Sequence, residues 1–304
     1  MKDANATVRG RSLELPAPAV HRFGDFVALT KPRLNSLVVV TAGIGYYLGA
    51  PRGVHPANLL EVVIGIALVA GGAAGLNQIY ERDTDSLMFR TRMRPVAAQR
   101  ITTGEATMFS LTLAVVGLAI VAARSNLLAA FLTLLTLISY NVIYTPMKRR
   151  SQLATLVGAV PGALPPMIGW VAARGALTPE GWALFAIDFV WQIPHFMAIA
   201  WLYRADFSRA GFPLLPVVEP SGRSTARQAV LFSLVLVPLS LVPYFLRMSG
   251  AAYAVGAAAG SAALLALAIS FAIRRTDDRA RLLFFGSITY LPVLWGMLIL
   301  DRLQ

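Results

Sequence analysis

NQIYERDTDSLMFRTRMRP, residues 77–95, is the stretch that decides how this chain is organised, because it places acids and then bases at the end of an apolar segment. Asn77, Glu81 and Asp85 follow one another at intervals of four residues. On a helix each such step advances by about 40° around the axis and about 6 Å along it. We therefore expect these three oxygen-bearing side chains to converge on one side of a helix end.

Oxygen ligands on one helix face suit a hard divalent cation such as Mg²⁺, which takes one or two carboxylates and completes its shell with substrate phosphate and water. Arginines close behind such a face hold phosphate oxygens, and here they are Arg90, Arg92 and Arg94, ahead of Pro95. The other interpretation is a solvated helix end, where the acids and arginines contact water and lipid headgroups. This stretch alone leaves both interpretations open.

The composition is that of a polytopic membrane protein. Of the 304 residues, 57% are hydrophobic and 14% are charged, which is a poor match to a water-soluble domain. The absence of cysteine excludes disulfides, thiolate metal sites and cysteine nucleophiles. Residues 1–22 contain no apolar core of a signal peptide, so we expect the first membrane span to direct insertion.

Nine apolar stretches each approach the roughly 20 residues that a helix needs to cross the hydrocarbon. The sequence therefore predicts an all-α bundle of nine transmembrane helices in a single domain, residues 23–304, after a cytoplasmic tail, residues 1–22. The predicted spans are 24–49, 58–80, 105–123, 126–145, 153–173, 180–203, 227–247, 251–273 and 282–300.

The distribution of basic residues predicts the orientation. The net charge of +12 could suggest a nucleic-acid partner, but the basic residues follow the topology and are dispersed among loops instead of forming one patch. With the N-terminus in the cytoplasm and the C-terminus outside, nearly all of the 27 Lys and Arg residues lie on the cytoplasmic side. Those on the other side are Arg52, Arg124, Arg174, Arg247 and Arg302. We accordingly expect no nucleic acid and a reaction site at the cytoplasmic face.

A polar stripe runs along the sixth predicted span. Asp188, Gln192 and His195 lie close to one helix face, and Asp206 recurs five turns after Asp188. An Asp at the centre of a span costs about 2.5 to 3.5 kcal/mol, so these residues must face protein or a cavity. For His195 an interhelical hydrogen bond and a contact with substrate, metal or a reacting centre remain equally open.

Further basic and aromatic side chains fall at the same depth. YTPMKRR places Tyr144, Lys148 and Arg149 at the end of the fourth span, and Tyr203 lies where the sixth span emerges. Arg33 begins the first span at that depth. Considered alone, such a basic cluster is usually only a topology signal.

Several motifs together resemble the intramembrane prenyltransferases of the UbiA superfamily, over most of the chain. They are Asn77-x-x-x-Glu81-x-x-x-Asp85 with RTRMRP, Tyr144 with Lys148-Arg149, GALPPMIGW (162–170), WQIPHFMAIAW (191–201), Asp206 and AGFPLLPVV (210–218). The run from Trp191 to Trp201 resembles the members that use haem as acceptor, because members with an aromatic acceptor would show a second aspartate pair there. The chain departs from the family pattern at 151–155, which lacks an asparagine, and at Asp188.

The resemblance implies a central cavity that opens laterally to lipid and a farnesyl transfer to a vinyl group of haem B, with addition of water to give haem O. Mg²⁺ would assist ionisation of farnesyl diphosphate. The implied metal ligands are Asn77, Glu81, Asp85 and Asp206, with Lys148 as a further catalytic residue. The implied substrate-binding residues are Arg33, Arg90, Arg94, Arg149, Tyr144, Tyr203, Trp191, Gln192 and His195, the last of them on the haem.

Two alternatives remain at this stage. An aromatic-ring prenyltransferase would reuse the same metal site, and a transporter would use the polar stripe of the sixth span as a solute pathway. The acids concentrated at one face favour a one-sided reaction site. The resemblance also implies the inner (plasma) membrane as location, and a haem A synthase or terminal oxidase assembly as protein partner.

Overall fold

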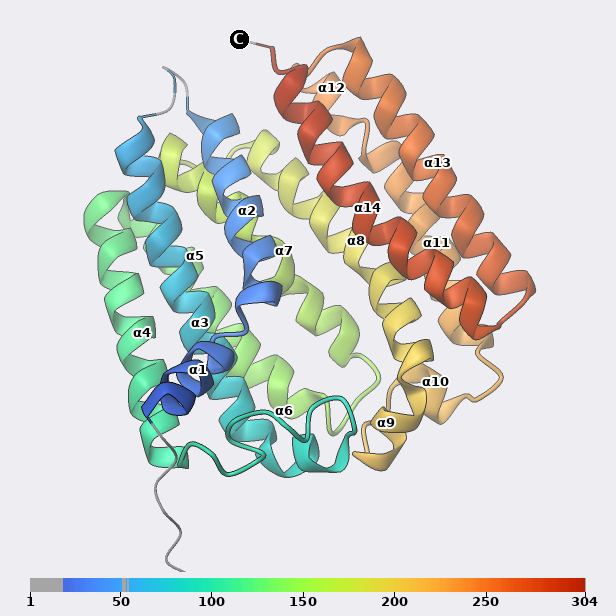
Figure 1. Cartoon of the computed structure of the whole chain (residues 1–304). Coiled ribbons are helices and arrows are strands. Elements are labelled where there is room, and N and C mark those ends of the chain that lie inside the picture. Colours follow the sequence, from blue (N-terminus) through green and yellow to red (C-terminus); the bar gives the residue numbers. More distant parts are fainter. Residues whose placement is uncertain (1–18, 51–52, 54, 304) are drawn as a thin grey trace, which may run out of the picture.

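The chain is an all-α membrane protein in the computed structural model, which describes residues 19–50, 53, 55–303 (Figure 1). Most of the predicted tail, residues 1–22, and Arg52 lie outside this part. The described residues contain no β-strand, only an isolated bridge between Ser249 and Arg302. The helices are α1 (Ala19–Leu29), α2 (Pro32–Gly49), α3 (Pro56–Leu87), α4 (Thr103–Arg124), α5 (Leu127–Ile138), the π-helical η1 (Ser139–Tyr144), α6 (Thr145–Met147), α7 (Ala154–Arg174), α8 (Pro179–Leu202), α9 (Arg204–Arg209), α10 (Leu215–Val218), α11 (Arg223–Leu239), α12 (Val242–Phe245), α13 (Ala251–Ile273) and α14 (Asp277–Leu300).

Within the described residues, eight stretches are long and apolar enough to cross a membrane. They are α3, α4, α5 continued through α6, α7, α8, α11 continued through α12, α13 and α14. The remaining long helix is α2, which begins with the polar residues Arg33 and Asn35. The predicted number of nine spans and the predicted orientation of the termini stay predictions.

The first predicted span, 24–49, is not one helix. The chain breaks between α1 and α2 at Lys31, which has left-handed backbone angles of φ 47° and ψ 56°, and α2 starts at Pro32. Proline disfavours helical angles in the residue before it and cannot donate a helical hydrogen bond, so Pro32 begins a helix and ends the preceding one. This break turns Lys31 toward α3, where its ammonium group donates to Asn77.

The second predicted span, 58–80, is too short, because α3 continues to Leu87. The polar face predicted for residues 77–85 therefore belongs to the same rigid helix as the apolar span before it. Gly75 lies where α3 crosses α4, and a methyl group there would collide with the hydroxyl of Ser110. Close packing of these two helices fixes the height and rotation of the acidic end of α3.

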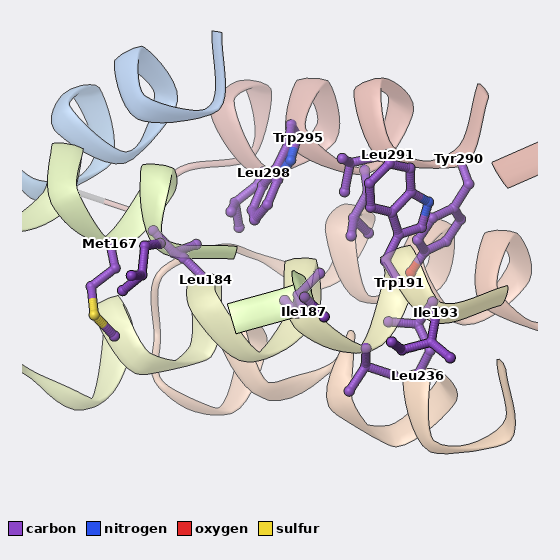
Figure 2. Close-up of a cluster of buried hydrophobic side chains, with 14 of the residues drawn as sticks. Met167, Leu184, Ile187, Trp191, Ile193, Leu236, Tyr290, Leu291, Trp295 and Leu298 are labelled. Atoms are coloured by element: carbon purple, nitrogen blue, oxygen red, sulfur yellow. The ribbon is translucent and has the colours of Figure 1, made fainter. Parts of the chain in front are cut away.

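The core of the bundle lies along α8, which packs against α7, α11 and α14. Figure 2 shows side chains from these four helices meeting there: Met167, Leu184, Ile187, Trp191, Ile193, Leu236, Tyr290, Leu291, Trp295 and Leu298. Large apolar side chains also cover the outside, among them Val115, Val255 and Ile273, each more than 60% exposed. Exposed apolar surface of this kind is expected where helices face lipid instead of water.

Candidate functional site

A cavity of about 270 Å³ lies where the ends of α3, α6 and α8 meet the loop 88–101 and α9. These ends lie toward the bottom of Figure 1. One part of its wall is charged or polar, and the other is apolar. The polar wall consists of Lys31, Asn77, Glu81, Asp85, Arg90, Arg94, Tyr140, Tyr144, Lys148 and Thr155. The apolar wall consists of Leu34, Met88, Ala154, Phe196, Ile199, Ala200, Phe207, Phe212 and Leu214.

Asp85 occupies the end of the acidic face and is fully buried. One guanidinium nitrogen of Arg94 lies 2.8 Å from each of its two carboxylate oxygens. The same nitrogen is 3.9 Å from Glu81, so Arg94 reaches both acids. The spacing in the sequence predicted that the acids share one helix face, and α3 brings both of them to the cavity.

Glu81 accepts a hydrogen bond of 2.8 Å from Lys148, which comes from the end of α6. The ammonium group of Lys148 also lies 4.6 Å from the ring centre of Tyr144, a distance at which a cation is attracted to an aromatic face. Burial lowers the pKa of Lys148, but the Glu81 carboxylate, Tyr144 and Tyr140 together raise it by more, so the pKa lies above its ordinary value. Lys148 therefore stays charged inside the protein.

Asn77 completes the face. Its side-chain oxygen accepts from the ammonium of Lys31 at 2.8 Å, and its amide nitrogen donates to the hydroxyl of Thr145 at 3.2 Å. These two contacts fix the amide so that its oxygen points to the cavity side. Each predicted metal ligand of α3 is thus adjacent to a basic side chain.

The donor set of the cavity fits Mg²⁺ and does not fit a metal held by protein alone. In the described part of the chain, no three His, Cys, Asp or Glu side chains are close enough to form a metal site. Asp85 and Glu81, with the amide oxygen of Asn77, offer the one or two carboxylates that Mg²⁺ uses when phosphate and water complete its shell. The neighbouring guanidinium and ammonium groups supply the charge that a diphosphate needs.

Asp206 lies at the same end of the bundle, on α9, but it does not line the cavity. Its carboxylate accepts from the backbone nitrogen of Arg90 at 3.3 Å and pairs with the guanidinium of Arg209. Arg90 and the next residue of α9, Phe207, both line the cavity. Asp206 therefore borders the loop that carries Arg90 and is not remote from the acids of α3.

Several predicted site residues lie away from the cavity wall. They are Arg33, Arg149, Tyr203, Trp191, Gln192 and His195. Arg149 reaches the hydroxyl of Thr84 and the carbonyl of Tyr80 on α3, both at 3.4 Å. Gln192 donates to the carbonyl of Ala159 at 3.0 Å, which joins α8 to α7. His195 contacts Ser287 on α14.

Three polar residues of the cavity wall, Lys31, Tyr140 and Thr155, were not assigned a role from the sequence. Lys31 enters through the break before Pro32, and the Lys-Pro pair is the signal that could have shown it. Tyr140 faces the cavity from η1, where an extra residue in the helical turn rotates the side chains. Nothing in the local sequence predicts a π-helical turn, so this position required the structure.

The comparisons with known proteins agree with this architecture. The model of the UbiA prenyltransferase family matches residues 37–289. The chain is 46% identical to protoheme IX farnesyltransferase of Solibacter usitatus, over 91% of this chain and 98% of that protein. It is 44% identical to the protein of that name from Opitutus terrae, over 93% and 96%. The chain therefore belongs to the UbiA prenyltransferase family of intramembrane enzymes.

Solved structures share the fold at low sequence identity. Digeranylgeranylglyceryl phosphate synthase superimposes with a TM-score of 0.78 at 16% identity, covering 92% of this chain and 98% of that one. A UbiA homologue from Archaeoglobus fulgidus bound to GPP and Mg²⁺ gives a TM-score of 0.63 at 16% identity, covering 90% and 99%. These likenesses confirm the predicted all-α membrane fold.

Proposed function

We propose that this protein transfers the farnesyl group of farnesyl diphosphate to a vinyl group of haem B, with addition of water, to give haem O. The relatives that share up to 46% of its residues carry the name of that activity. The observation that carries the proposal is the cavity itself, in which Glu81 and Asp85 face Arg94 and Lys148. A site of alternating acids and cations suits a substrate that combines a metal ion with a diphosphate.

The polar wall has the charge distribution required to bind the diphosphate. Arg94, Lys148 and Lys31 each donate to an acidic or amide oxygen of α3, so each can move its hydrogen bonds to phosphate over a short distance. Mg²⁺, when bound by the oxygens of α3, supplies the electrophile that stabilises the leaving diphosphate. Positive side chains already held in the low-dielectric cavity need little reorganisation to stabilise that charge.

The apolar wall suits the isoprenoid part of the substrate. Leu34, Phe196 and Ile199 line the same cavity as the charged residues. Such a surface accepts an isoprenoid chain and keeps water away from the allylic carbon until the acceptor vinyl group is in place. Asp206 holds the backbone of Arg90, and we propose that it orients this arginine or provides a further metal ligand.

We also propose that the cavity lies on the cytoplasmic side of the inner membrane, because the loop 88–101 and the end of α6 gather basic residues around it. A haem A synthase or a terminal oxidase assembly is the class of partner that would receive the product.

Extraction of haems from a host that lacks its own haem O synthase tests the function. We expect mass analysis to detect haem O in cells that express the chain, and at least a hundredfold less with Asp85→Asn, because the buried carboxylate beside Arg94 is lost. The matched control is Asp83→Asn on the same helix, whose side chain is 76% exposed and pairs with Arg82. It should leave haem O unchanged.

The acceptor is tested with purified protein. Farnesyl diphosphate is supplied with haem B or with an aromatic acid acceptor, each with Mg²⁺. Product from the aromatic acceptor and none from haem B would overturn the proposed acceptor while leaving the diphosphate site intact. Equal haem O yields from Asp85→Asn and Asp83→Asn would overturn the role of the cavity.

A further inference from the structure

Four side chains join α8 to α14 one turn away from the cavity. Trp191 and His195 are four residues apart on α8, and Phe284 and Ser287 are three apart on α14. The imidazole ring of His195 stacks on Trp191 with centroids 5.3 Å apart, and on Phe284 with centroids 5.1 Å apart. The interplanar angles are 19° and 21°, so both aromatic rings lie nearly parallel to the imidazole.

The hydrogen bonds of Ser287 assign the proton on the imidazole. The hydroxyl of Ser287 has one proton, and it donates to the carbonyl oxygen of Phe284 at 2.7 Å. Nδ1 of His195 lies 2.8 Å from the same hydroxyl oxygen, which accepts from Nδ1 when its own proton is donated to Phe284. In neutral imidazole one nitrogen carries the proton and the other a lone pair. In this arrangement the proton is on Nδ1 and the lone pair on Nε2.

Ser287 is itself held firmly in place. Its backbone carbonyl accepts from the indole nitrogen of Trp191 at 2.8 Å, and its side chain is fully buried. Trp191 thus covers one face of His195 and also fixes the residue that binds Nδ1. The arrangement restrains both the position of the imidazole and its rotation.

We infer that Ser287 is a positioning residue that holds His195 with Nε2 presented to the iron of the haem acceptor. This inference rests on the proposed function and selects one of the two contacts left open by the sequence. A haem propionate accepts hydrogen bonds and would repel a lone pair on Nε2. Among the described residues, no three metal-binding side chains form a cluster. Haem iron does not need one, because the porphyrin already supplies four nitrogen ligands and a single imidazole can bind the iron as a further ligand.

The location is compatible with the cavity. Ile199, one helical turn after His195 on α8, belongs to the apolar wall, as does the adjacent Phe196. His195 is partly exposed, and no hydrogen bond reaches its Nε2 from the described part of the chain. Trp191 and Phe284 stack against the ring, whereas a metal binds imidazole nitrogen in the plane of the ring.

The first test measures the tautomer in haem-free protein. The chain has three histidines, so selective ¹⁵N labelling with His195→Ala for assignment gives a resolved nitrogen NMR spectrum. We expect the wild-type signal of His195 to report a proton on Nδ1, and Ser287→Ala to shift it toward the Nε2–H form. A wild-type His195 with its proton on Nε2 would overturn the inference, whatever the enzyme's activity.

The second test is a titration of the full chain with ferric haem, followed by optical and electron paramagnetic resonance spectra. We expect Ser287→Ala to weaken haem binding about 10- to 100-fold and to alter the imidazole–iron signature, as loss of an orienting hydrogen bond does at other metal sites. The matched control is Ser261→Ala, an equally buried helical serine on α13 that should change neither quantity.

A wild-type iron signature in Ser287→Ala, or in His195→Ala, would overturn the inference. Haem O formation by the same preparations is scored separately by mass. Normal haem O with no imidazole–iron signal removes the role of His195 but leaves the proposed function standing. If Ser287→Ala does not fold, the tautomer of the wild-type protein still decides the matter.

Discussion

The pairing of single residues across the chain surrounds the acidic end of α3 with basic side chains. Glu81 and Lys148 are 67 positions apart and meet at 2.8 Å, with side chains 5% and 21% exposed. In this environment each charge depends on the other. Removing one partner of a buried pair is costly because it leaves an uncompensated charge, whereas removing both is often tolerated.

We predict that Glu81→Gln lowers the free energy of unfolding by about 3 kcal/mol or more, because the ammonium of Lys148 loses its counter-charge. The double variant Glu81→Gln/Lys148→Met should regain most of that stability while remaining inactive. Denaturant unfolding in detergent micelles, followed by circular dichroism, measures these differences.

The control for this prediction is Asp83→Asn, in an exposed pair with Arg82 on the same helix, where an ion pair contributes little. Its unfolding should match that of the wild type. A double variant as unstable as Glu81→Gln alone would show that the buried pair does not determine the loss.

At the residue scale the sequence predicted which side chains share a face but not what they contact. The four-residue spacing of Asn77, Glu81 and Asp85 is a local property of one helix, and the structure keeps it. The partners Lys31, Lys148 and Arg94 come from three other segments, and their arrival depends on how the helices pack. The contact of Asp206 with the backbone of Arg90 was not predicted for the same reason, because the two residues are 116 positions apart in the sequence.

At the element scale the break between α1 and α2 sets the position of Lys31. Lys31 has left-handed angles, which cost a non-glycine residue about 1 to 2 kcal/mol. Pro32 favours the break because it disfavours helical angles in the residue before it. The ammonium group consequently lies 2.8 Å from Asn77 instead of on the outer surface of a continuous helix.

We predict that Pro32→Ala lets α1 and α2 join, withdraws Lys31 from the cavity and weakens binding of a farnesyl diphosphate analogue about tenfold, the effect of one charge-assisted hydrogen bond. Calorimetric titration with a thiodiphosphate analogue and Mg²⁺ measures the affinity. The control is Pro56→Ala at the start of α3, where the preceding residue has an ordinary φ of −85°. Equal losses in both variants would contradict the role of the break.

Hydropathy predicted the elements well because crossing a bilayer demands an apolar run of a set length. It could not predict where helices bend within or continue beyond the hydrocarbon. The extension of α3 to Leu87 keeps polar residues helical, and η1 differs from an α-helix only in its hydrogen-bond spacing. Neither feature changes the mean hydropathy of its stretch, so the sequence pattern alone does not reveal it.

At the scale of the whole molecule, the two ends of the bundle differ in structure. The cavity and the charged loops around it lie at one end. At the other end the guanidinium of Arg302 donates to the carbonyls of Tyr47 and Ala50, both at 2.9 Å, and ties the end of α14 to the end of α2. Asp301 accepts from the backbone nitrogen of Tyr253 and so fixes the start of α13. Polar contacts thus tie the helices together at the end away from the cavity.

The orientation of this asymmetric bundle is open to a direct test because the sequence contains no cysteine. Met93, 67% exposed in the loop at the cavity end, and Ala176, exposed in the loop between α7 and α8 at the other end, are suitable single-cysteine sites. We predict that a membrane-impermeant maleimide labels Ala176→Cys in intact spheroplasts but labels Met93→Cys only after permeabilisation. This pattern follows from the excess of Lys and Arg at the cavity end, which retains that end in the cytoplasm. Haem O production by both variants confirms that the labelled protein is folded. The reverse labelling pattern would place the proposed diphosphate site outside the cell, which contradicts a reaction on the cytoplasmic side.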